Sequence, residues 1–187
     1  MFILYAIPIG LIVGLLVGGR VERLAAVHFR LSRLAILALV IQLGLFSPLA
    51  DGLARDLGRA IYVASTALVA VAVLANVGLT GVPLIVLGAA SNLAAIVANG
   101  GAMPASPTAL AALGLGVGGN TNSIAVDHPV LEPLTDVFAL PAWLPLANVF
   151  SVGDILIGLG VAIGIVAAMR HRGEDEPPAE EWSDRPA

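Results

Sequence analysis

The sequence predicts an all-α transmembrane fold with about five membrane-spanning helices. Of the 187 residues, 58% are hydrophobic and only 12% are charged, which is about half the charge of a typical soluble domain. In addition, residues 60–126 contain no Asp, Glu, Lys or Arg. Because a soluble fold would need charged faces in so long a stretch, we expect lipid rather than water around it.

Five apolar stretches are the expected spans, and each is long enough to cross the hydrocarbon core of about 30 Å. The first lacks a positive leading region and an Ala-x-Ala cleavage pattern, so we expect it to be retained. A further apolar stretch at 107–118 is too short to cross and is expected to be re-entrant or interfacial. The expected spans are residues 1–18, 34–50, 60–79, 82–98 and 151–169.

Arginine clusters predict the orientation of these spans. One cluster occupies residues 20–33, after the first span, and a second occupies residues 170–172, after the last. By the positive-inside rule both lie in the cytoplasm, so the N-terminus lies outside and the C-terminus inside. Residues 1–172 then form one polytopic membrane domain. Residues 173–187 are acidic and rich in proline, which predicts a disordered cytoplasmic tail.

Small and polar residues within the spans suggest contacts between helices. Gly10, Gly14 and Gly18 share one helix face, which would allow close packing in lipid, although glycine is also simply common in membrane helices. Asn92 lies in the middle of a span. Since an amide in lipid needs a partner, Asn92 is expected to point into the bundle, either to link helices or to line a polar path.

The candidate site is the stretch from Asn99 to Asp154, whose polar groups all fall on the predicted outer side. Asp136 and Asp154 stand at the ends of an apolar stretch that is interrupted by prolines and can fold back. Two carboxyl groups brought close together can share a proton. One then acts as a base on water and the other as an acid, which is sufficient to hydrolyse an amide.

Each candidate residue also has a purely structural interpretation. The segment from Ser151 to Asp154 matches a capping box at the start of a helix, and Asp136 fits a solvated loop. The segment Asn99-Gly100-Gly101 fits a helix C-cap. His128 fits a loop residue or a hydrogen-bond partner, because no recognisable ligand spacing surrounds it.

Composition excludes several classes of chemistry. The chain contains no Cys and no Lys, so disulfides, thiolate metal sites and lysine Schiff bases are ruled out. We expect no metal and no cofactor, and without a basic patch we expect no nucleic acid. The expected partners are the lipid bilayer and a lipid-linked or membrane-inserted substrate; the oligomeric state stays open.

The order of several motifs resembles a family of small bacterial polytopic membrane proteins of unknown function. That resemblance covers most of the chain and implies a bacterial inner-membrane protein without naming an activity. The motifs are Asn99-Gly100-Gly101-Ala102-Met103-Pro104, the later His128, Leu134-Thr135-Asp136-Val137 and Phe150-Ser151-Val152-Gly153-Asp154.

A weaker resemblance links the last third of the chain to lipoprotein signal peptidase (signal peptidase II), an intramembrane aspartyl peptidase. The chain resembles that family in a Gly-Asn element, at Gly119-Asn120, and in two aspartate elements. These are Asp136-Val137-Phe138 and Phe150-Ser151-Val152-Gly153-Asp154. Ser123 and Ile124 replace the Asp-Arg pair of that family. The resemblance implies that Asp136 and Asp154 form the catalytic dyad.

We therefore expect either a membrane aspartyl hydrolase or a non-enzymatic membrane protein that binds lipid or small molecules, transports them, or takes part in an assembly. Asp136 and Asp154 are the expected catalytic residues. The expected substrate-binding residues are Asn99, Gly100, Gly101, Asn120 and His128.

Overall fold

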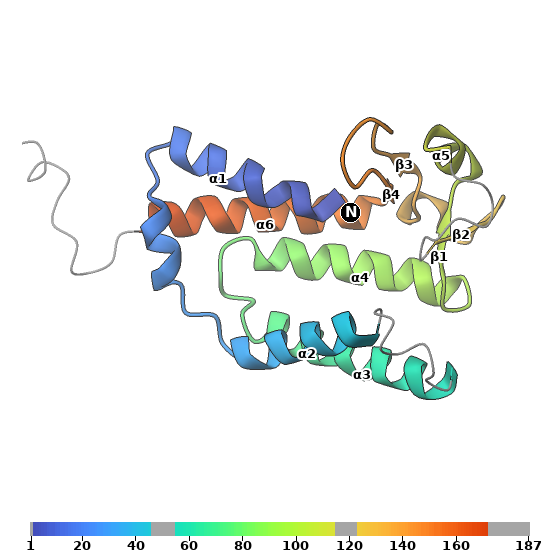
Figure 1. Cartoon of the computed structure of the whole chain (residues 1–187), viewed down its shortest axis with the longest axis horizontal. Helices are drawn as coiled ribbons and strands as arrows, with labels where there is room; N and C mark the ends of the chain where they lie inside the picture. The colour runs from blue at the N-terminus through green and yellow to red at the C-terminus, as the bar shows by residue number, and fades with distance from the viewer. Residues whose placement is uncertain (1, 46–54, 115–122, 172–187) are drawn as a thin grey trace, which may run out of the picture.

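The computed structural model describes residues 2–45, 55–114 and 123–171. Five helices of eleven or more residues dominate it, and the strands gather at one end (Figure 1). The long helices are α1 (Ala6–Leu16), α2 (Ser32–Leu45), α3 (Arg55–Leu74), α4 (Val82–Ala98) and α6 (Val152–Arg170). The short elements are η1 (Phe2–Tyr5), η2 (Val21–Ala26), β1 (Met103–Ala105), α5 (Pro107–Ala112), β2 (Ser123–Ala125), η4 (Glu132–Leu134), β3 (Phe138–Ala139) and β4 (Val149–Phe150).

The long helices coincide with the five apolar stretches of the sequence, although α3 begins at Arg55 rather than near residue 60. Within the described ranges, α6 is the one helix that is long and apolar enough to cross a membrane by length and composition. Shorter apolar helices cover Phe2–Leu16, Ser32–Leu45, Ala64–Leu74 and Val82–Ala98. The count of five crossings therefore stays a prediction.

Helix α6 is the centre of the packing. Helices α1 and α4 both lie along it, and α2 packs against α3 as a separate antiparallel pair (Figure 1). The turn into α4 depends on Gly81, whose φ of 91° is left-handed and therefore strongly favours glycine. Since α6 touches helices from both the beginning and the middle of the chain, it joins distant parts of the sequence.

Glycines allow α4 and α6 to approach closely. A Cβ atom at Gly160 would lie 2.6 Å from the carbonyl oxygen of Gly81, and one at Gly153 would lie 2.6 Å from that of Gly88. In each helix the two glycines are seven residues apart, so they face the same neighbour along two turns. The predicted glycine face of α1 is confirmed for Gly10 and Gly14, which approach α6, but not for Gly18, which has open space around it.

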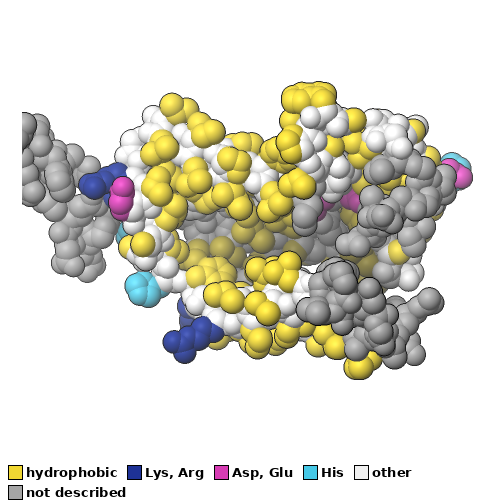
Figure 2. Space-filling model, in the orientation of Figure 1, with side chains coloured by type: hydrophobic (Ala, Val, Ile, Leu, Met, Phe, Trp, Pro, Cys, Tyr) yellow, Lys and Arg dark blue, Asp and Glu magenta, His cyan; other side chains and the backbone are white. Residues whose placement is uncertain are grey.

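Large apolar side chains cover the outer surface of the helices, and charged side chains lie mainly near the two ends (Figure 2). Leu16 is 80% exposed, Val97 is 68% exposed and Leu43 is 64% exposed. Exposed apolar side chains that run over several helices are typical of a surface that contacts lipid or another protein.

A small core holds the strand-bearing end together. It consists of Ala105 from β1, Ala109 and Leu110 from α5, and Val149 from β4. The strands form two ladders: β1 pairs with β2 in parallel, and β3 pairs with β4 in antiparallel orientation. These elements fix the backbone of the candidate site.

Candidate active site

The candidate site lies where the end of α4 and the beginning of α6 meet the two strand ladders (Figure 1). The C-terminus of α4 and the N-terminus of α6 both lie at this end, because the two helices run in opposite directions. The second half of α4 supplies Asn92 and its C-cap supplies Asn99. The chain after η4 supplies Asp136, and the start of α6 supplies Asp154.

The start of α6 is a complete capping box, as the sequence pattern predicts. The backbone N–H of Asp154 donates to Ser151 Oγ at 3.0 Å, and the backbone N–H of Ser151 donates to Asp154 Oδ2 at 3.2 Å. Two of the backbone donors at the helix start are thereby satisfied. The carboxylate also lies at the helix N-terminus, which the helix dipole favours.

Asn92 joins this capping box to α4. Its Nδ2 donates to Asp154 Oδ1 at 2.9 Å, and its Oδ1 accepts a hydrogen bond from Ser151 Oγ at 2.7 Å. The prediction that Asn92 points into the bundle and links helices is thus confirmed. Both oxygens of Asp154 now have donors, so the orientation of the carboxylate is fixed by α4 as well as by its own helix.

Asp136 is buried rather than solvated, with 6% of its surface exposed. Its backbone is bound into an extension of the first ladder, because its N–H donates to Pro104 O at 3.0 Å and its carbonyl accepts from Ser106 N–H at 3.0 Å. The interpretation of Asp136 as a solvated loop residue is therefore wrong. Its buried position follows from the pairing with β1, which the sequence pattern does not reveal.

The register of the second ladder puts the backbone segments that carry Asp136 and Asp154 on the same side of that ladder. Phe138 in β3 lies opposite Phe150 in β4. In an antiparallel pair, the residues before one partner lie beside the residues after the other. Asp136 precedes Phe138 by two residues and Asp154 follows Phe150 by four, so both leave the ladder on the same side.

An aromatic stack strengthens this ladder. The rings of Phe138 and Phe150 lie 5.4 Å apart, and the ring of Phe2 from η1 stacks on Phe150 at 4.3 Å. Tyr5 also donates a hydrogen bond to the carbonyl oxygen of Pro145, in the loop between β3 and β4. The beginning of the described chain is thereby attached to the site.

Asn99 and the glycines after it form the C-terminal cap of α4. The N–H of Gly101 donates to Ile96 O at 2.8 Å and that of Gly100 to Val97 O at 3.3 Å, which is a Schellman motif. Both glycines have left-handed φ angles, 75° and 94°. The structural interpretation of this segment is confirmed, and its predicted part in substrate binding stays a prediction.

The side chain of Asn99 also holds a distant loop. Its Oδ1 accepts from Val130 N–H at 2.9 Å and its Nδ2 donates to Val130 O at 2.8 Å. The amide therefore imitates a backbone partner for Val130. The nearby Asp127 and His128 are exposed at this end of the molecule. Asn120, the remaining predicted site residue, lies outside the described residues.

The polar groups of this end do not form a metal centre where the structure describes them. Among residues 2–45, 55–114 and 123–171, no group of three or more His, Asp or Glu side chains is placed to hold a metal ion. What the site offers instead is a buried carboxyl group, a carboxylate with a fixed orientation, and two amides.

Comparisons with known proteins give one match. A family model described as a family of unknown function, DUF5317, matches residues 26–166. That region contains α2 to α5, both ladders and most of α6. No curated protein and no solved structure matches the chain.

Proposed function

Because the chain belongs to the DUF5317 family, whose function is not known, we propose its role from the geometry of the site: a multi-pass membrane protein that hydrolyses a membrane-borne amide with Asp136 and Asp154. The observation that supports this proposal is the pairing of Phe138 with Phe150, whose register puts the backbone at Asp136 and at Asp154 on the same side of the second ladder. The site lies at one end of a bundle whose sides are apolar.

The placement in a membrane is supported by the distribution of side chains. The helix sides expose large apolar residues, whereas Arg20, Arg23 and Arg170 lie at the end opposite the ladders. Trp143 is 81% exposed in the loop between β3 and β4, a position that suits an aromatic anchor at the level of the lipid headgroups. The active end would then face the outer surface.

The proposed reaction divides the work between the two carboxyl groups. Asp154, oriented by Asn92 and by the backbone of Ser151, accepts a proton from a water molecule as that water attacks the carbonyl carbon. The carbon–nitrogen bond then breaks, and Asp136 gives a proton to the leaving amine. Water is consumed, and a carboxylic acid and an amine are produced. The buried setting of Asp136 helps to exclude bulk water.

A second candidate function rests on the hydrogen bonds of Asp154. Both of its oxygens are occupied within the capping box and by Asn92, which is also what a purely structural carboxylate would show. In that case the polar end binds a membrane-borne ligand without cleaving it. The alternatives differ in the role of Asp136 and Asp154, so substitution can separate them.

The test uses purified protein in liposomes together with a panel of membrane-spanning and lipid-modified peptides, and mass spectrometry detects cleavage. Asp136→Asn and Asp154→Asn should each lower cleavage by about 100-fold or more. Asp127→Asn, which removes an exposed carboxylate at the same end, should leave cleavage unchanged. Full activity in either of the first two variants would exclude catalysis by the pair. Binding of a peptide without cleavage by the wild type would support the second function.

Membrane placement can be tested separately, because the chain contains no cysteine. Single cysteines at the exposed positions Asp127 and His171 should react with an impermeant maleimide from opposite sides of intact cells or spheroplasts. Labelling of both positions from one side, or a protein that stays in solution without detergent, would contradict the topology.

A further inference from the structure

A cavity lies at the other end of the molecule, far from the aspartates. Its volume is about 550 Å³, and its walls come from η2 and the segment after it, from the turn between α3 and α4, from the start of α4, and from α6. The walls are mainly apolar, as at Leu24, Ile85 and Val161. Gly160 and Gly164 belong to the α6 wall, where they pack against the backbone of the turn between α3 and α4.

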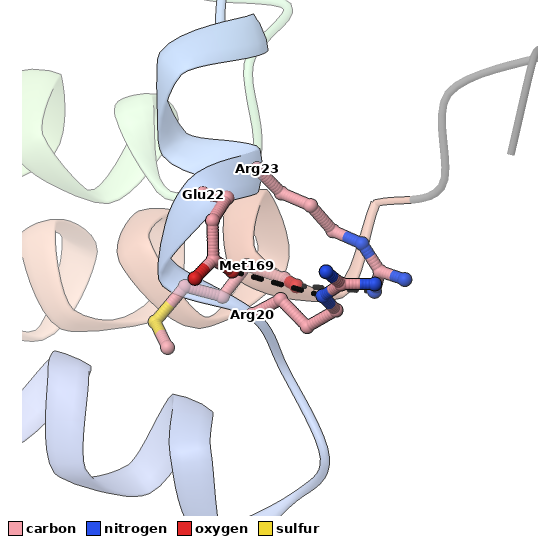
Figure 3. Close-up of polar contacts among 4 residues, drawn as sticks. All are labelled: Arg20, Glu22, Arg23 and Met169. Carbon is pink, nitrogen blue, oxygen red and sulfur yellow. Dashed lines mark hydrogen bonds and ion pairs between the residues drawn. The ribbon is translucent and has the colours of Figure 1, made fainter. Parts of the chain in front are cut away.

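Basic and hydrogen-bonding side chains line the same cavity. They are Arg23 from η2, His28 from the following segment and His171 at the end of α6. Nη1 of Arg23 donates to Met169 O at 3.3 Å, which holds this guanidinium group beside the end of α6 (Figure 3). None of the described residues that line the cavity is acidic.

Glu22, the acidic residue of η2, is paired with Arg20. Glu22 lies 3.6 Å from Nε of Arg20, measured from its carboxylate oxygen, and the backbone N–H of Arg20 donates to Met169 O at 2.9 Å. Figure 3 shows the side chains of Arg20 and Arg23 extending in the same direction past the last turn of α6. The two arginines therefore lie at one level of the bundle, beside the end of α6 (Figure 3).

We propose that this cavity binds an anionic phospholipid, with an acyl chain against the apolar walls and the phosphate at Arg23, His28 and His171. An apolar cavity with cationic and hydrogen-bonding groups on one side is complementary to a molecule with an apolar chain and an anionic head. Basic pockets between membrane helices bind such head groups. The proposal rests on the membrane placement proposed above, since the Arg-rich end must lie at headgroup level.

The apolar and the basic parts of the cavity can be tested independently. Native mass spectrometry of the detergent-purified protein measures the bound fraction of phosphatidylglycerol and of phosphatidylcholine. Arg23→Gln removes the cation, and its matched control is Arg33→Gln, an exposed arginine outside the cavity. Ala168→Phe fills part of the cavity, and its matched control is Leu43→Phe on the exposed surface of α2.

The wild type is expected to retain phosphatidylglycerol in preference to phosphatidylcholine. Arg23→Gln should weaken this binding about five-fold, because one basic residue at the membrane surface raises the affinity for an anionic lipid by about that factor. Ala168→Phe should weaken binding of the lipid as a whole, and both controls should behave as the wild type. Circular dichroism should show unchanged helix content in all four variants.

Three outcomes would overturn the inference: equal retention of the two lipids, an equal loss in Arg23→Gln and Arg33→Gln, or displacement of the lipid by free glycerol phosphate at the same concentration. In each case the protein would still require detergent, so the membrane placement would survive. A chain that is soluble without detergent would instead overturn the proposed function, which separates the two failures.

Discussion

The backbone groups that lack a partner within the helix are satisfied by different means at the two ends of α6. At its beginning, the free backbone donors are met by Ser151 and Asp154, which are in turn bound by Asn92 from α4. At its end, the carbonyl of Met169 accepts from the backbone of Arg20 and the side chain of Arg23. Negative charge at the start and positive charge at the end both match the helix dipole.

The packing around these ends differs in rigidity. At the start of α6, Gly153 lies against the backbone of Gly88 and the amide of Asn92. At the end, Gly14 of α1 lies against the side chain of Met169. Backbone and hydrogen-bonded groups cannot move aside cheaply, whereas a methionine side chain is flexible. The site end is therefore the more exactly specified of the two.

The largest expected effect is that of adding a methyl group at each end. Gly153→Ala should lower the free energy of unfolding by about 1–3 kcal/mol, because the new Cβ would collide with Asn92 and with Gly88 O. Gly14→Ala should cost less, since Met169 can change rotamer. Thermal unfolding in detergent micelles measures both, with Gly78→Ala as the control in open space. Equal losses in the first two variants would contradict the difference in rigidity.

Next in size is the link between α4 and the capping box. Asn92→Ala should lower the free energy of unfolding by about 1–2 kcal/mol, because Asp154 Oδ1 loses its donor and Ser151 Oγ its acceptor. Gln42→Ala removes an exposed side-chain hydrogen bond to Thr66 and should change stability by less than about 0.5 kcal/mol. A double-mutant cycle of Asn92→Ala with Asp154→Ala that gave no coupling would exclude a direct interaction.

The smallest effect concerns the exposed cation at the end of α6. Arg170→Gln should cost about 0.3–1 kcal/mol at low ionic strength, since a cation in the last turn favours the helix dipole. Arg33→Gln, at the start of α2, should be neutral or slightly stabilising because a cation there opposes the dipole. Unfolding at low and high salt tests the pair: an Arg170→Gln effect that persists in high salt would not be electrostatic.

The sequence predicts the long helices well, because hydrophobic stretches bounded by glycine, proline and arginine mark them. Helix α4 begins and ends at Val82 and Ala98 as expected, and the cap at Ser151 is recognisable from four residues. The start of α3 is missed because hydropathy reports lipid contact, whereas a helix can extend into charged sequence. Whether each helix crosses a membrane is a separate question that the helix boundaries do not answer.

The strands could not be predicted, since segments of two or three residues are too short to show alternation. The burial of Asp136 depends on them, because it follows from pairing with the chain around Pro104 and Ser106. The sequence predicts that Asn92 has a hydrogen-bond partner in the bundle, because an amide in an apolar helix needs one. Which residue is that partner could not be predicted, because it depends on where α4 and α6 cross. That crossing is set by Gly88 and Gly153, which are sixty-five residues apart.

The central position of α6 also has a consequence for biosynthesis. Helices α1 and α4 emerge from the ribosome well before the helix against which both of them pack. Until residues 152–170 have been made, the glycine-lined face of α4 and that of α1 have no permanent neighbour. We therefore expect the native arrangement to be completed late in translation, and chains truncated before α6 to be recognised as unassembled and degraded.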